Sequence, residues 1–272
     1  MKGPLILLAH SIKRVRALVL VMGAMLAIFQ VFLILVGRTL ERSNAFEQIG
    51  SLIPPFMREL LGPSIATLLS FDGIVCVGYF HVAVMSSLVA LCIALGTIPT
   101  SEIETGFMDL ILSRPLARHW IVTRSIIVVT LCTLALLAMM MFGTWAGLHA
   151  FAPREIAWPA PRLILSFAIN LGLLMLSWGG IALAIGSGSR RRSVAGSLAG
   201  LLALAAFLLD YVARAWQPAE SVAWLSPFRY YNPFDLLIGK GLSAGNLSVL
   251  AGISVMGFAL AYLLFSRRDI SH

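Results

Sequence analysis

Charged side chains are scarce in this chain of 272 residues. Asp, Glu, Lys and Arg make up only 12% of it, whereas an ordinary soluble domain has roughly 25%. Hydrophobic residues make up 59%, and the mean hydropathy is +0.93. A soluble domain needs enough polar side chains to cover its surface, and this chain does not have them. The composition therefore predicts an integral membrane protein.

Motifs for independent catalysis are also missing. Gly239-Lys240 is followed by Gly241 rather than by Ser or Thr, so the phosphate loop of ATPases is absent. Neither HExxH nor Ser-x-x-Lys occurs. The three cysteines, at positions 76, 92 and 132, form neither a CxxC motif nor a disulfide framework. We therefore expect no enzymatic activity, no catalytic residue, and no metal or cofactor bound by this chain.

Long apolar runs dominate what is present. A helix needs about 20 apolar residues to cross the hydrocarbon core of a bilayer, and six stretches qualify: 17–36, 73–99, 125–151, 163–189, 194–213 and 241–266. Backbone amides in lipid must find their partners within the segment, which favours helices. The sequence thus predicts an all-α, polytopic membrane protein with six transmembrane helices in a single permease domain, 1–272.

The basic residues predict the orientation. With a cytoplasmic N-terminus, twelve of the twenty basic residues but only four of the twelve acidic ones fall on the cytoplasmic side. The whole net charge of +8 then lies on that side, as the positive-inside rule requires. Both termini are expected in the cytoplasm. Because no basic stretch is interleaved with stacking aromatics, a nucleic-acid partner is not expected.

The N-terminal segment 1–16 has an amphipathic pattern. Its apolar residues lie near one helical face and its basic residues toward another; they are Leu5, Ile6, Leu8, Ile12 and Val15 against Lys13, Arg14 and Arg16. Such a pattern predicts an interfacial helix that contacts membrane lipid or a partner. A simple basic flank before the first span is the alternative.

The loop after the second predicted span contains another amphipathic pattern. Ser101 and Glu104 fit a capping box. Apolar residues then recur at helical spacing, at positions 103, 107, 110 and 111. Pro115 disfavours helix at Arg114. The spacing predicts a short amphipathic cytoplasmic helix over 101–114, between spans two and three.

The predicted external segment 214–240 is rich in aromatic residues: Trp216, Trp224, Phe228, Tyr230, Tyr231 and Phe234. Aromatic rings collect at the level of the lipid headgroups, so the composition indicates an interfacial belt. A substrate gate is the alternative.

Three motifs carry a family resemblance. The segment Ser101–Arg118 combines acidic residues, a glycine, an apolar helix and a Ser-x-Pro-x-x-Arg ending, and it resembles the cytoplasmic loop of ABC-2-type transporter permeases. Ser226–Pro233, before the last span, and the terminal Phe265–Ile270 are also similar to that family. The resemblance covers the whole chain.

The resemblance implies the permease subunit of an ATP-binding-cassette exporter in a bacterial cytoplasmic membrane. Its partners would be cytoplasmic ABC ATPase subunits, which bind ATP and Mg, and a second permease copy or homologue. In that family the loop helix is the coupling helix that docks on the ATPase. The matching residues here are Glu102, Glu104, Gly106, Phe107, Leu110, Arg114, Pro115 and Arg118.

Two glycine pairs predict close helix contacts. Gly143 and Gly147, in the third span, and Gly196 and Gly200, in the fifth, follow the small-xxx-small pattern. We expect Gly196 and Gly200 to contact a second permease subunit. Packing within one chain is the alternative.

Two other functions stay open at this stage. A stand-alone secondary carrier or channel would need ionisable residues inside its spans, and His81 is the sole central titratable residue. A copper- or sulfur-related maturation permease is possible within the family, and Met139, Met140, Met141 and the cysteines are soft ligands. Consecutive residues on a helix point about 100° apart, so the three methionines are not expected to converge on one ion.

Overall fold

The computed structural model describes residues 2–52, 67–106, 117, 119–153 and 155–267, and in these ranges the regular structure is helical. The helices are α1 (Lys2–Arg42), α2 (Ala45–Leu52), α5 (Phe71–Phe80), α6 (Val82–Gly96), α7 (Ile98–Glu104), α9 (His119–Phe151), α10 (Pro161–Gly188), α11 (Arg192–Ala213), α12 (Gln217–Glu220), α13 (Pro233–Leu237) and α14 (Ala244–Ser266), with 3-10 turns at Ala223–Leu225 and Pro227–Tyr230. Six stretches are long and apolar enough to span a membrane, α5 and α6 together forming one. The chain is an all-α, multi-pass membrane protein, which confirms the predicted fold class.

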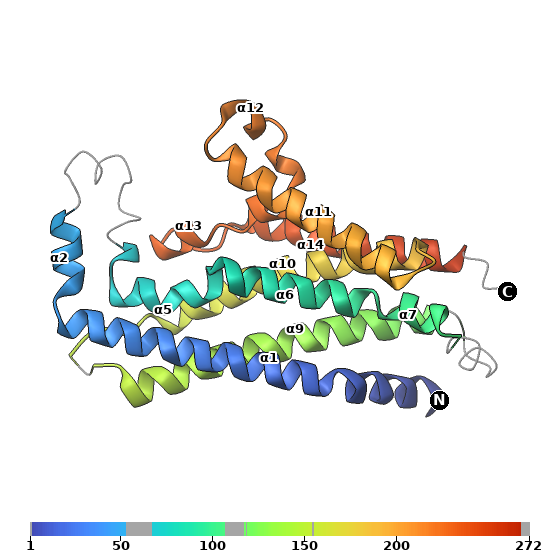
Figure 1. The fold of residues 1–272 in the computed structure, drawn as a ribbon, viewed down its shortest axis with the longest axis horizontal. Coiled ribbons are helices and arrows are strands. Elements are labelled where there is room, and N and C mark those ends of the chain that lie inside the picture. Colours follow the sequence, from blue (N-terminus) through green and yellow to red (C-terminus); the bar gives the residue numbers. More distant parts are fainter. Residues whose placement is uncertain (1, 53–66, 107–116, 118, 154, 268–272) are drawn as a thin grey trace.

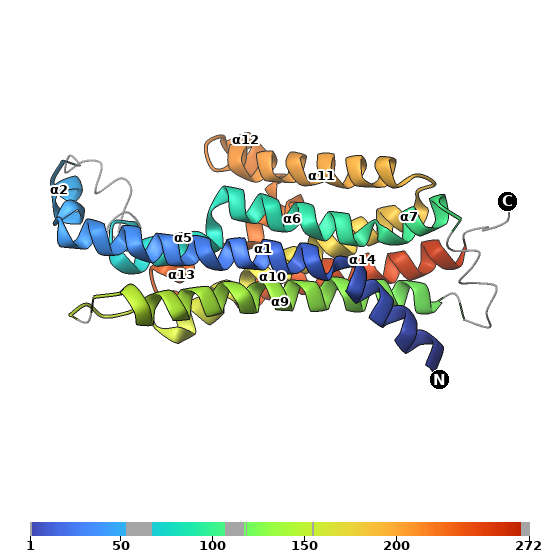
Figure 2. The ribbon, with the colours of Figure 1, turned by 60° about the horizontal axis from the view of Figure 1, so that its bottom comes forward.

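The long helices lie side by side in one bundle (Figure 1). The start of α1 and the end of α14 lie at the same end of the bundle, as does α7, whereas α2 and α12 lie toward the opposite end (Figures 1 and 2). α10 is the central helix and packs against α14, α6, α9 and α11, while α1 packs mainly on α9 and α5. α11 diverges from the bundle toward α12 (Figure 1).

Small residues allow a close contact between the backbones of α10 and α14. A methyl group on Gly257 would lie 2.5 Å from the carbonyl carbon of Gly180. Beside this contact, the Ser177 hydroxyl donates to the Leu250 carbonyl at 2.9 Å. Apolar side chains gain little by leaving lipid for a helix interface, so close backbone approach and interhelical hydrogen bonds stabilise such pairs.

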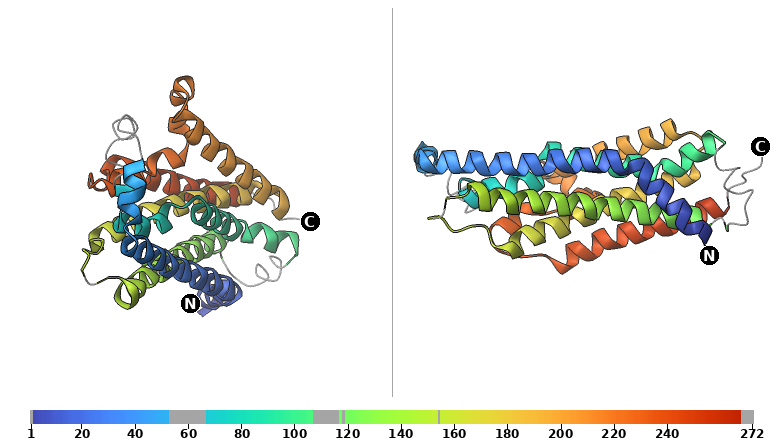
Figure 3. Two further views of the ribbon diagram at one scale, coloured as in Figure 1. Left: turned by 60° about the vertical axis from the view of Figure 1, so that its left-hand side comes forward. Right: turned by 90° about the horizontal axis from the view of Figure 1, so that it is seen from below.

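The first helix differs from its prediction. The sequence predicted an interfacial helix over 1–16 and a separate span over 17–36, but α1 is one helix of 41 residues. No Gly or Pro occurs between Leu5 and Met22 to end it. Its N-terminal part bends away from the bundle (Figures 2 and 3).

The second predicted span, 73–99, is not a single helix. It is divided at His81, whose extended backbone (φ −60°, ψ 129°) separates α5 from α6, and again at Thr97, after which Ile98 and Pro99 begin α7. At the first break the His81 Nδ1 accepts from the Ala83 amide at 3.3 Å. The buried Tyr231 hydroxyl donates to the Tyr79 carbonyl at 2.9 Å. Burial raises the pKa of Tyr231, so this hydroxyl remains a donor.

The two glycine pairs have different surroundings. Gly143 and Gly147, on α9, lie directly against α1, where a methyl group on Gly143 would lie 2.6 Å from the Ala27 Cα. A methyl group on Gly196 or on Gly200 would meet no atom within 4 Å. Within the part of the chain that the structure describes, Gly196 and Gly200 therefore have no helix packed closely against them.

We predict that Gly257→Ala destabilises the bundle, because the added methyl group collides with the α10 backbone. The expected cost is about 1–3 kcal/mol, measured as a lower midpoint of thermal unfolding in detergent. Gly252→Ala is the matched control on the same helix, since a methyl group there meets nothing within 4 Å. Equal midpoints for the two variants would contradict the packing described here.

Candidate functional site

The short helix α7 lies at the end of the bundle that holds the start of α1 and the end of α14 (Figures 1 and 2). Pro99 is in its first turn, where a missing N–H costs nothing. The buried Thr100 hydroxyl donates to the Gly186 carbonyl of α10 at 2.8 Å. This bond joins α7 to the last turn of the central helix.

Glu102 links α7 to two further helices. Its side chain is only 4% exposed, and it forms an ion pair and hydrogen bond with Arg124 of α9, whose side chain is equally buried. Arg14 of α1 lies 3.9 Å from the other carboxylate oxygen. A buried carboxylate is costly unless a counter-charge accompanies it, so Glu102 keeps α7 beside α9.

Glu104 connects the same helix to α11. Its carboxylate accepts from the backbone N–H of Arg192, the first residue of α11, at 2.9 Å. The side chain of the α11 N-cap residue, Arg191, makes no capping hydrogen bond to that turn. Glu104 therefore caps α11 from another helix, and its negative charge complements the positive end of the α11 dipole.

Ile103 adds apolar contacts to these polar ones. It packs against a buried cluster made of Ile121, Val122, Leu183, Ala261 and Phe265, which belong to α9, α10 and α14. α7 directly follows α6 in the chain, and its residues contact the other five spans, α1, α9, α10, α11 and α14. We call Thr100, Glu102, Ile103 and Glu104 the α7 junction.

The α7 junction corrects the predicted loop helix. Ser101 is not the N-cap, because α7 already begins at Ile98, and Ser101 lies inside it. The helix ends at Glu104, and Gly106 follows in the left-handed region, with φ 70°. Of the other residues matched to the family loop, Phe107, Leu110, Arg114, Pro115 and Arg118 lie outside the described residues.

Sequence reasoning missed the partners of the acidic residues. Glu102 and Glu104 were singled out for contact with an ATPase, yet within this chain they bind Arg124 and Arg192. One signal was available: Arg124 begins a long apolar run, where an unpaired charge would be expensive. No pattern in the sequence pointed to the contact of Thr100 with Gly186.

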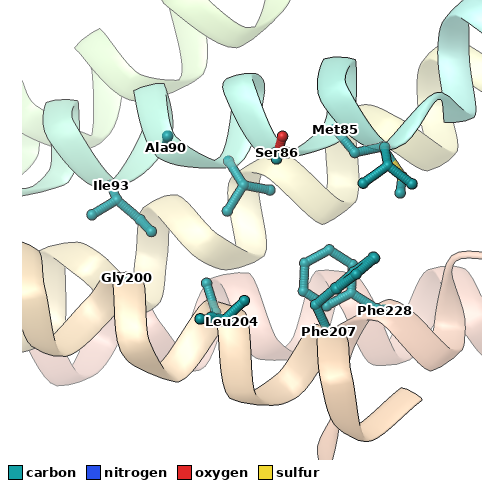
Figure 4. Close-up of a pocket in the computed structure, with 11 residues that line it drawn as sticks. Met85, Ser86, Ala90, Ile93, Gly200, Leu204, Phe207 and Phe228 are labelled. Carbon is teal, nitrogen blue, oxygen red and sulfur yellow. The ribbon is translucent and has the colours of Figure 1, made fainter. Parts of the chain in front are cut away.

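A groove between α6 and α11 is the second candidate feature. Its apolar part is a cavity of about 300 Å³ that includes Ala90 and Ile93 on α6 and Gly200 and Leu204 on α11 (Figure 4). A second cavity of about 510 Å³ shares Val82, Met85, Phe207 and Phe228 with the first and extends to the break at His81. We call the two together the α6–α11 groove.

The far end of the groove carries its polar groups. His81, Asp210 and Arg214 line it. The Asp210 carboxylate accepts from the Arg214 Nε at 3.2 Å and from one terminal nitrogen at 2.8 Å. Asp210 is largely buried, whereas the Arg214 side chain is 46% exposed. His81 is exposed and contacts the Phe29 ring edge-on at 5.8 Å.

The aromatic segment before the last span divides into two groups. Trp216 and Trp224 are 60% and 62% exposed, as an interfacial belt would be. Phe228 and Tyr231 are buried and, with Phe234, line the groove. The prediction of a belt thus fits only the two tryptophans, while Phe228, Tyr231 and Phe234 form a groove wall.

The candidate soft ligands, the three cysteines and Met139–Met141, lie in the part of the chain that the structure describes. There, no group of three or more His, Cys, Asp or Glu residues is placed to hold a metal ion. The Cys92 thiol lies 3.8 Å from the Thr133 hydroxyl. Met140 is fully buried, while Met139 and Met141 are only partly so, consistent with their divergent directions on α9.

We predict that Glu102→Gln destabilises the protein strongly, because it leaves Arg124 buried without a counter-charge. Removing one partner of a buried ion pair costs about 3–5 kcal/mol, which unfolding in a denaturant series would measure. Combining it with Arg124→Gln should restore much of the loss. Glu104→Gln is the control at the same junction, and its smaller effect is expected because Glu104 is exposed. A double variant as unstable as the single one would contradict the pairing.

The comparisons with known proteins do not name a family for this geometry. No family model matches the chain, and no curated protein matches it. The resemblance to ABC-2-type permeases therefore stays a prediction that depends on the motifs in the sequence. The α7 junction and the α6–α11 groove are the structural features on which a function can be argued.

Proposed function

We propose that this chain is the membrane-spanning permease subunit of an ATP-binding-cassette exporter of the ABC-2 type in a bacterial cytoplasmic membrane. Separate cytoplasmic subunits would hydrolyse ATP, since the sequence has no phosphate loop of its own. The loop that contains α7 is the proposed docking site for those subunits. A second permease copy or homologue would complete the transporter.

The α7 junction is the observation that carries this proposal. Thr100, Glu102 and Glu104 bind α10, α9 and α11, respectively. A partner that displaces the segment after Gly106 would move α7, and these bonds would pass the displacement to the attached ends of the spans. A loop that merely reversed the chain would need no such contacts.

The charges within the bundle support this proposal over a stand-alone carrier. Such a carrier needs an ionisable group that can gain and lose an ion at the substrate site. Glu102 is bound by Arg124, and Asp210 is bound by Arg214. A carboxylate held by arginine is a poor coupling group, because its charge is already neutralised and one of its oxygens, Oε2 in Glu102 and Oδ2 in Asp210, already accepts from a guanidinium.

The open glycines of α11 support contact with another permease subunit. A methyl group on Gly196 or Gly200 would have no neighbouring atom within 4 Å, although their spacing suits close helix approach. Large apolar side chains on the same helix are exposed as well, among them Leu198 and Leu201. We propose that part of this surface faces the second copy and the rest faces lipid.

We predict that Glu104→Arg uncouples the transporter. The substitution removes the α11 cap and places a positive charge at the positive end of that helix dipole. The full chain would be purified together with its ATPase partner and reconstituted in liposomes, where partner-dependent ATP turnover should fall at least tenfold. Glu155→Arg is the matched control, an exposed acid in the α9–α10 connection at the other end of the bundle.

Two results would contradict the proposal. One is unchanged turnover in Glu104→Arg when the variant assembles normally with the ATPase. The other is substrate movement by the purified chain in liposomes that contain no ATPase, which would favour a stand-alone carrier or channel.

A further inference from the structure

The two cavities of the α6–α11 groove form one path of changing polarity. At one end lie the side chains of Ala90, Ile93 and Leu204, and at the other lie His81, Asp210 and Arg214. From Ile93 to Val82 the groove follows α6 for eleven residues, about 16 Å along the helix axis. Its apolar part is therefore elongated along α6, a shape that suits a hydrocarbon chain better than a compact solute.

The groove is open on its side. Val82 and Leu204, which line it, are 55% and 54% exposed. The stick view places Leu204 and Phe207 of α11 opposite the α6 side chains, with Gly200 adding no side chain to the wall (Figure 4). In a membrane, the part of this opening that the second permease copy does not cover faces lipid. A molecule could therefore enter from the bilayer without crossing the protein.

The polar end can bind a negative group. The guanidinium of Arg214 has five N–H donors, of which Asp210 uses those on two nitrogens. Beside it, the break at His81 places the start of α6 at the cavity wall. First-turn amides have no acceptor within their own helix; here the Ala83 amide donates to the His81 Nδ1, and the positive end of the α6 dipole still attracts anions. Lys240 is paired with Asp235 at 2.9 Å and does not line the cavity.

We propose that the α6–α11 groove binds a membrane amphiphile with one hydrocarbon chain and an anionic headgroup. The chain lies between α6 and α11 as far as Ile93 and Gly200. The headgroup lies at Arg214 and the first turn of α6, beside His81. The binding site depends on the groove alone, whereas the statement that the bound molecule is the exported substrate depends on the proposed function.

Gly200 provides a specific test, because a larger side chain fits there without collision and occupies the groove. The full chain in detergent would be titrated with nitroxide-labelled stearate, and the immobilised fraction measured by electron paramagnetic resonance. Gly200→Leu should weaken binding at least tenfold. Gly196→Leu is the matched control: it lies one helical turn away and is equally open, but it does not line the groove. Ala90→Leu, on the opposite wall, should repeat the effect of Gly200→Leu.

Competition experiments test the headgroup. Lysophosphatidylglycerol should displace the probe at least tenfold better than lysophosphatidylcholine with the same chain, and glycerol phosphate alone should not displace it. The neutral pair Asp210→Asn with Arg214→Gln should abolish this preference while the labelled stearate still binds weakly. Thermal unfolding of each variant would show that it is folded.

Several outcomes would overturn the proposal. Equal weakening by Gly200→Leu and Gly196→Leu would place the effect at a subunit contact instead. Equal displacement by the two lysolipids would show that the site does not select an anionic headgroup. Displacement by glycerol phosphate alone would show that binding does not require a hydrocarbon chain. These measurements use no ATPase, so they test the binding site separately from the proposed function. If the probe binds as expected but Glu104→Arg leaves ATP turnover unchanged, the exporter proposal fails and the binding site stands.

Discussion

The buried ion pair between Glu102 and Arg124 is the constraint on which the rest of this architecture depends. Both side chains are 4% exposed, and neither charge is tolerable there without the other. α7 must therefore stay against α9, even though its chain has just left the membrane-spanning part of α6. Thr100 and Glu104 then fix the same short helix to α10 and α11. A loop that would otherwise be a simple connection becomes a rigid part of the bundle.

α6 connects this rigid end to the groove. Its C-terminal end leads into the α7 junction, and its N-terminal end lies at the His81 break beside the polar part of the groove. α11 forms the other groove wall and is capped by Glu104 at the junction. Both walls are thus held to α7 at one end only, so a displacement of α7 would tilt them and change the distance between them farther along the groove. This arrangement relates the proposed ATPase docking site to the proposed binding site.

The sequence predicted the features that depend on local composition. The six spans follow from long apolar runs, and the absence of a phosphate loop needs no structure. The break at His81 could not be predicted, because no Gly or Pro marks it and Tyr231 supplies a partner from 152 positions away. The glycine pairs make the same point: Gly143 and Gly196 begin the same pattern, but only Gly143 has a helix against it. The burial of Glu102 likewise depends on an arginine 22 positions away, on another helix.

The most direct test of the central claim is a pair of distances measured by pulsed electron paramagnetic resonance in the complex with its ATPase. Spin labels at Thr105 and Ser193 report on the α7 junction, and labels at Ala90 and Leu204 report on the α6–α11 groove; all four residues are exposed. When ATP is trapped with vanadate, the account predicts an unchanged distance at the junction and a shifted distance across the groove. A junction that separates while the groove keeps its width would contradict it.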